Sequence, residues 1–147
     1  SDTKEVLNMN GTSNILIVDD EEVVRTSYLR TLAGLNCNIL AVWNGHEALN
    51  EMERQPFDVV LLDLRMPDID GIAVLKTIKE RWPESQVVII TGHASLETAK
   101  EALRHGAYDY LAKPVGPDDV IKATKAAILQ KKWTLQPCGA ECEIKQN

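Results

Sequence analysis

Three short apolar runs, each followed by a polar residue, constrain the fold of this chain more than any other feature. The runs span residues 14–18, 59–62 and 86–90, and they are followed by Asp19-Asp20, Asp63 and Thr91. The run before Asp63 is four apolar residues long, and two of the four are valine. Apolar runs of this length indicate strands that are covered on both faces, as the strands of a parallel sheet are.

The segments between these runs have the spacing of amphipathic helices. Strands are predicted at 14–18, 38–42, 59–62, 86–90 and 107–112, and helices at about 22–35, 44–55, 72–82, 95–104 and 117–131. Asn44 and Ser95 are expected to cap the second and fourth helices, and Gly106 to end the fourth. The alternation predicts an α/β fold, in which helices cover both faces of a doubly wound, five-stranded parallel sheet with right-handed crossovers.

Length and charge narrow the class of protein. The 147 residues suit one domain, which we expect at 13–131, with an N-terminal extension at 1–12 and a tail or the start of a linker at 132–147. The net charge of −6 argues against nucleic-acid binding by these residues. The chain has no apolar run near the roughly 18 residues of a membrane span, so no membrane partner is expected.

The cysteines indicate a reducing environment. The chain has three, Cys37, Cys138 and Cys142, and an odd number without a regular framework favours a reduced, cytoplasmic protein. Cys138 and Cys142 lack two further ligands nearby in the sequence, so a zinc site is not expected there.

Polar residues at four strand ends predict a site for phosphoryl transfer. In a parallel sheet, Asp19-Asp20, Asp63, Thr91 and Lys113 all reach one edge, where open α/β sheets bind ligands. Three neighbouring carboxylates stay ionised only with a cation between them, and oxygen ligands of this density suit Mg²⁺. Thr91 adds a hydroxyl and Lys113 a positive charge. This set predicts phosphoryl transfer onto Asp63 to give an acyl phosphate.

The same residues match a known family. The chain resembles a bacterial response-regulator receiver domain over residues 13–131. The marks of the resemblance are Asp19-Asp20-Glu21, Asp63 with Met66-Pro67 and Asp70-Gly71, Thr91-Gly92, and the run 106–114 that ends on Lys113-Pro114. The resemblance implies a flavodoxin-like (βα)5 fold with strand order 2-1-3-4-5 and a phosphorylation-controlled switch in two-component signalling.

The resemblance also implies a role for each site residue. Asp63 would be the phospho-acceptor, taking the group from a sensor histidine kinase. Asp20, Asp63 and the backbone carbonyl of Arg65 would bind Mg²⁺ directly, and Asp19 through a water. Lys113 would pair with the phosphoryl group, and its bond to Pro114 would be cis.

Further residues would transmit the signal or set its duration. Thr91 would move to hydrogen-bond the phosphoryl group, and Tyr110 would turn inward as Thr91 moves. The fourth helix, fifth strand and fifth helix would form the surface that controls an output domain or partner, such as a transcriptional one, and could pair two copies. Arg65 and His93, each two residues beyond a site residue, are expected to tune the phosphate lifetime. Such a domain catalyses its own phosphorylation and dephosphorylation and transforms no separate substrate.

Three other functions would share parts of this pattern. A flavodoxin-like cofactor binder needs a phosphate-cradling loop after the first strand, where this chain has two aspartates and two glutamates. A phosphatase with an aspartyl intermediate places a second aspartate two residues after the nucleophile, where this chain has Arg65. A receiver-like module that binds proteins without phosphorylation stays open as the alternative.

Several conspicuous residues have structural interpretations. Asp58 begins the strand that leads to Asp63, so we expect it about 16 Å away at the opposite edge, in a structural role. Asp68 and Asp70 are expected to shape their loop. Trp43 and Trp82 are interpreted as packing residues.

Overall fold

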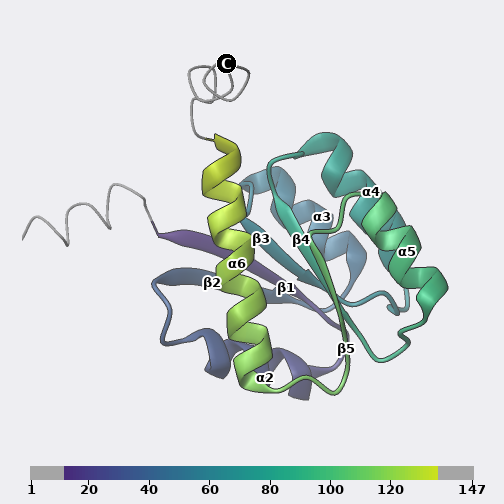
Figure 1. Ribbon diagram of the computed structural model, residues 1–147, viewed down its shortest axis with the longest axis horizontal. Coiled ribbons are helices and arrows are strands. Elements are labelled where there is room, and N and C mark those ends of the chain that lie inside the picture. The colour runs from purple at the N-terminus through teal and green to yellow at the C-terminus, as the bar shows by residue number, and fades with distance from the viewer. Residues whose placement is uncertain (1–11, 136–147) are drawn as a thin grey trace, which may run out of the picture.

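The computed structural model, which describes residues 12–135, has five parallel strands alternating with five helices (Figure 1). The strands are β1 (Ser13–Val18), β2 (Cys37–Val42), β3 (Val59–Leu62), β4 (Gln86–Thr91) and β5 (Asp109–Ala112). The helices are α2 (Glu22–Leu32), α3 (Gly45–Arg54), α4 (Gly71–Arg81), α5 (Leu96–Arg104) and α6 (Pro117–Leu135). The sheet order is β2-β1-β3-β4-β5, so the predicted fold class and strand order are confirmed.

The helices form two layers, one on each face of the sheet. One apolar cluster joins alternate strand residues to α3, α4 and α5, and includes Leu16, Met52 and Ile78. The other joins the remaining strand residues to α2 and α6, and includes Leu32 and Ala127. Because successive side chains of a strand point to opposite faces, an unbroken apolar run fills both clusters at once.

The position of each strand in the sheet explains its composition. Central β3 is buried along its whole length, and so is β4. Strand β2 lies at the edge of the sheet, and its residues alternate between exposed and partly buried up to Val42. The pattern of β2 is therefore weaker than that of the central strands.

Helix ends follow the predicted capping residues at two helices. The Asn44 side chain accepts a hydrogen bond from the Glu47 N–H at 2.8 Å and caps α3. The Ser95 side chain forms a reciprocal capping box with Thr98 at the start of α5. Gly106, with φ of 98°, follows the end of α5 in the left-handed conformation that glycine adopts most easily.

Three expectations are corrected. The apolar spacing predicts Leu35 in the first helix, but α2 ends at Leu32, and Leu35 packs on the core from the following turn. The last helix continues through Leu135, four residues beyond the predicted domain boundary at 131. Trp43 is 53% exposed, so its interpretation as a packing residue is wrong, whereas Trp82 packs on the core beneath the Arg81 guanidinium.

Some expectations fall outside the described residues. These are residues 1–11 of the N-terminal extension, residues 136–147 of the tail, and Cys138 and Cys142. Within residues 12–135, none of the helices is both long and apolar enough to cross a membrane.

Asp58 has the structural role expected of it. Its side chain accepts a hydrogen bond from the Asn14 N–H at 2.7 Å and forms an ion pair with Lys131 of α6. It therefore ties the amino ends of β1 and β3 to the last helix, at the edge of the sheet opposite Asp63.

Candidate functional site

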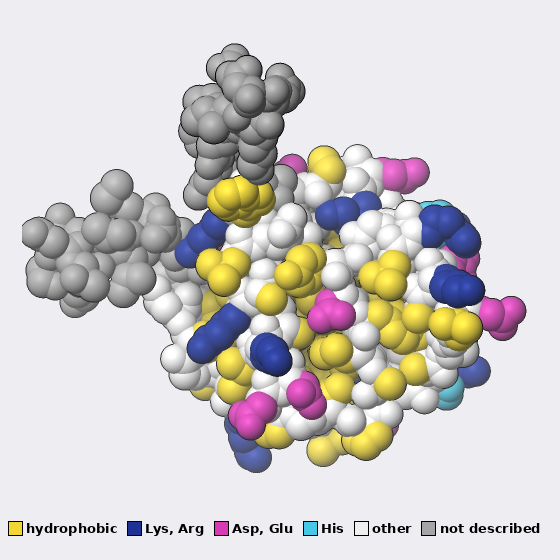
Figure 2. Space-filling view, in the orientation of Figure 1, with side chains coloured by type: hydrophobic (Ala, Val, Ile, Leu, Met, Phe, Trp, Pro, Cys, Tyr) yellow, Lys and Arg dark blue, Asp and Glu magenta, His cyan; other side chains and the backbone are white. Residues whose placement is uncertain are grey.

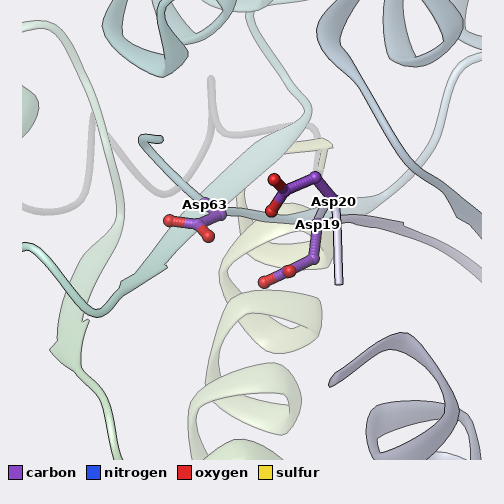
Figure 3. A group of neighbouring side chains, drawn as sticks. All are labelled: Asp19, Asp20 and Asp63. Carbon is purple, nitrogen blue, oxygen red and sulfur yellow. The ribbon is translucent and has the colours of Figure 1, made fainter. Parts of the chain in front are cut away.

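Three aspartate side chains from two neighbouring strand ends converge at the carboxyl edge of the sheet (Figure 3). Strands β1 and β3 are paired with Val18 opposite Leu62, so Asp19 and Asp63 both follow paired residues. One carboxylate oxygen from each of Asp19, Asp20 and Asp63 lies within 4.8 Å of the others. Asp19 and Asp63 are buried, whereas Asp20 is exposed. The sequence correctly placed these three carboxylates together.

Lys113 brings a positive charge into the same cluster. Strands β4 and β5 are paired with Thr91 opposite Ala112, so Lys113 leaves the sheet beside the aspartates. Its Nζ lies 2.7 Å from Asp19 Oδ2, 3.2 Å from Asp63 Oδ2 and 4.0 Å from Glu21 Oε1. The Lys113–Pro114 peptide bond is cis, as expected.

The charges of the cluster do not balance without a further cation. Burial raises the pKa of Asp19 even though Lys113 and the Glu21 N–H donate hydrogen bonds to it. Burial also opposes the charged form of Lys113, but the hydrogen bond and charge of Asp19, followed by those of Asp63, raise the pKa of Lys113 overall. Two like charges about 4 Å apart repel by about 4 kcal/mol at an effective dielectric constant near 20. The lysine therefore offsets one of three negative charges, and the oxygen ligands suit a divalent cation.

Backbone hydrogen bonds hold the two acidic loops in place. The Asp19 Oδ1 atom accepts from the Glu21 N–H at 2.9 Å, and the Asp19 carbonyl accepts from Arg25 Nη1 at 2.8 Å. The Asp63 N–H donates to the Val18 carbonyl at 3.0 Å, and Asp63 Oδ1 accepts from the Arg65 N–H at 3.3 Å. These contacts fix the aspartates before any ligand arrives.

An open hollow of about 460 Å³ lies over the cluster. Asp20, Asp63 and Lys113 line it, together with Arg65 and His93. Both residues that were expected to tune the phosphate lifetime therefore border the space next to Asp63. The hollow is large enough for a phosphoryl group, a metal ion and water.

The family model of the response regulator receiver domain matches residues 15–125. The chain belongs to this family. Receiver domains act in two-component signalling and are controlled by phosphorylation, so this receiver is a phosphorylation-controlled signalling module.

Individual relatives agree with this membership. The receiver is 38% identical over 127 residues to the DNA-binding transcriptional regulator NtrC of Salmonella typhimurium, covering 86% of this chain and 27% of that protein. It is 39% identical over 133 residues to the transcriptional regulatory protein ZraR of the same organism, covering 90% of this chain and 29% of that protein. This chain thus spans less than a third of the length of these relatives.

A solved structure agrees with the fold. The CheY-like response regulator receiver domain protein of Methanospirillum hungatei superposes with a TM-score of 0.80 at 28% identity. The match covers 84% of this chain and 98% of that one.

Two predicted switch residues of the receiver lie outside the hollow. Thr91 is fully buried at the end of β4, and its hydroxyl accepts a hydrogen bond from the His93 N–H at 3.1 Å. The Tyr110 hydroxyl lies 2.6 Å from Thr98 Oγ1 and accepts from the Ser95 N–H at 3.3 Å. Tyr110 thus contacts the start of α5 here, and its inward turn stays a prediction.

Glu21 is a further acidic residue at the site. Glu21 is one of the marks of the family resemblance, but no role at the site was predicted for it. In the receiver it lines the hollow, and its side chain approaches Lys113. The sequence feature that could have predicted this position is that Glu21 directly follows Asp19-Asp20.

Proposed function

We propose that this receiver takes a phosphoryl group from the phosphohistidine of a sensor kinase onto Asp63. A carboxylate oxygen of Asp63 attacks phosphorus while the bond from phosphorus to the donor imidazole breaks, so that the product is an acyl phosphate. The observation that carries this proposal is the convergence of Asp63 and Lys113 with two further carboxylates, Lys113 Nζ lying 3.2 Å from Asp63 Oδ2.

The donor set supports a magnesium ion at this site. Asp20, Asp63 and the Arg65 carbonyl would hold it, and Asp19 would contact it through a water. When bound, Mg²⁺ would neutralise charge on the phosphoryl oxygens. Lys113, already between two carboxylates, can turn to the phosphoryl group once it arrives, and Thr91 would donate its hydroxyl to the same group.

The names of the relatives support a transcriptional output. NtrC and ZraR are transcriptional regulators, so we expect this receiver to take part in the control of transcription, in the cytoplasm. The face made by α5, β5 and α6 would report the switch and could pair two copies. Figure 2 shows hydrophobic side chains spread across this face, and Leu96, Leu103 and Leu129 are each more than half exposed.

Metal-dependent self-phosphorylation tests the proposal. With acetyl phosphate and Mg²⁺, mass spectrometry should detect one added phosphoryl group, which EDTA prevents and mild base removes. Asp20→Ala should weaken Mg²⁺ binding by at least about tenfold in calorimetry, because it removes a direct ligand. A chain that binds neither Mg²⁺ nor a phosphoryl group would instead be a phosphorylation-independent binding module.

The phosphate lifetime is expected to depend on Arg65 and His93. Both side chains border the hollow, where they can crowd or order the water that attacks the acyl phosphate. Arg65→Ala and His93→Ala should each change the dephosphorylation rate by about threefold or more, because misplacing a reacting group by about 1 Å can change a rate by about 100-fold. Loss of labelled phosphate over time measures this. Unchanged lifetimes in both variants would remove the hypothesis.

A further inference from the structure

The loop between β3 and α4 forms one wall of the site. It carries Arg65, whose carbonyl is a proposed metal ligand, and Met66 and Pro67, which line the hollow. The Gly71 N–H donates to the Leu64 carbonyl at 3.0 Å and closes the base of this loop. That bond does not fix where the middle of the loop lies relative to the rest of the protein.

Asp68 connects the middle of this loop to a distant helix. Its Oδ1 accepts from the Gly45 N–H at 3.0 Å, and its Oδ2 accepts from the His46 N–H at 2.8 Å. The Nδ1 atom of His46 also lies 2.8 Å from Oδ2. Both partners belong to the first turn of α3. In the described part of the chain, Asp68 is the one side chain of residues 64–70 that hydrogen-bonds another helix or strand.

Side chains of the loop and of α4 pack closely against the first residue of α3 at the same place. Gly45 is buried, and a Cβ atom added there would lie 2.9 Å from Val74 Cγ2 and 3.1 Å from Ile69 Cβ. The missing side chain of Gly45 thus leaves room for Ile69 of the loop and Val74 of α4, and Asp68 accepts the hydrogen bonds across the contact.

We infer that Asp68 is a positioning residue for phosphorylation at Asp63. Its carboxylate fastens the β3–α4 loop to the first turn of α3, and thereby holds the Arg65 carbonyl and the wall of the hollow in place for the metal. This inference rests on the proposed phosphorylation of Asp63 and adds a residue that does not itself touch the reacting atoms.

Charge and helix geometry support this role. Burial alone would raise the pKa of Asp68, but the backbone N–H groups of His46, Gly45 and Ile69, together with the His46 ring, lower it overall. The carboxylate is therefore charged at neutral pH. A negative charge at the first turn of α3 also interacts favourably with the helix dipole.

A simpler role for Asp68 is to cap α3, and Asn44 provides a matched comparison. Asn44 also caps α3, through the Glu47 N–H at 2.8 Å, but within residues 12–135 its side chain makes no hydrogen bond to the β3–α4 loop. Asn44→Ala therefore removes a cap from the same helix and leaves the loop attached. A capping role predicts equal effects of the two substitutions, and a positioning role does not.

The test compares Asp68→Ala, Asp68→Asn and Asn44→Ala with the parent protein. Urea unfolding measures stability, calorimetry measures Mg²⁺ affinity, and phosphorylation over a range of acetyl phosphate concentrations separates kcat from KM. Asp68→Ala and Asn44→Ala should both lower the urea midpoint. Asp68→Ala should also weaken Mg²⁺ binding and lower kcat by about tenfold each, as loss of a residue that orients metal ligands does.

The remaining variants decide between the two roles. Asn44→Ala should stay within about twofold of the parent in both Mg²⁺ affinity and kcat, below the effect typical of outer-shell residues. Asp68→Asn keeps one acceptor oxygen, so its Mg²⁺ affinity and kcat should lie between those of Asp68→Ala and the parent. This variant also allows the test to be made if Asp68→Ala does not fold. If the Asp68 and Asn44 variants had equal Mg²⁺ affinity and equal kcat, the positioning role of Asp68 would be overturned, but the proposed function would not. If the parent protein itself were not phosphorylated, both the proposed function and the positioning role would be overturned.

Discussion

Asp63→Asn is expected to abolish phosphorylation while leaving the protein folded. The amide has no charged oxygen to attack phosphorus, so the rate from any donor should fall by at least about 10³-fold. The substitution retains the backbone hydrogen bond from the Asp63 N–H to the Val18 carbonyl, and Lys113 keeps Asp19 as a partner at 2.7 Å. It also removes one of three crowded negative charges, so stability without Mg²⁺ should be unchanged or higher. Mass spectrometry and urea unfolding measure the two effects.

Asp58→Asn is the matched control for this experiment. Asp58 precedes the same strand at its other end and is bonded to the Asn14 N–H and to Lys131. Its replacement should lower the free energy of unfolding by about 1–3 kcal/mol through the lost charged partner, without slowing phosphorylation. If Asp63→Asn still gained a base-labile phosphoryl group, or if Asp58→Asn lost it, the acceptor would have been assigned to the wrong residue.

The fold was predictable because the residue composition of its central strands indicates burial on both faces. The residues of β3 and β4 are buried on both faces, so nearly every position is apolar, and the parallel alternation follows from the helical segments between them. The sequence indicates edge strand β2 and the ends of the helices less clearly. The end of α2 at Leu32 and the extension of α6 through Leu135 depend on contacts that local periodicity does not record.

The acidic cluster was predictable for a related reason, whereas its supports were not. Parallel strands bring their carboxyl ends to one edge, so Asp19, Asp63 and Lys113 had to meet once the strands were known. Asp68 was interpreted only as a loop-shaping residue, because its partners lie 22 and 23 residues earlier in the sequence. The contact of Tyr110 with Thr98 is likewise a tertiary contact, between β5 and α5, that spacing in the sequence does not predict.

Gly71→Ala is expected to destabilise the protein and disturb the site together. Gly71 begins α4, and a Cβ atom there would lie 2.5 Å from Leu64 Cα and 2.7 Å from the Asp63 carbonyl oxygen. Both neighbours are backbone atoms that cannot rotate away, so either α4 or the chain after Asp63 must move. The free energy of unfolding should fall by about 3 kcal/mol, the upper part of the range for overpacking, as measured by urea unfolding.

Gly34→Ala separates this effect from the general consequences of replacing glycine. A Cβ atom at Gly34 would have no atom of its surroundings within 4 Å, so stability should change by no more than about 0.5 kcal/mol. The Gly71 variant that remains folded should also accept phosphate more slowly, because the displaced carbonyl belongs to the acceptor residue itself. Gly71→Ala with the stability and phosphorylation rate of the parent would mean that α4 can slide without disturbing Asp63. The rigidity of the β3–α4 loop would then contribute nothing to the geometry of the acceptor, and the positioning role of Asp68 would lose its physical basis.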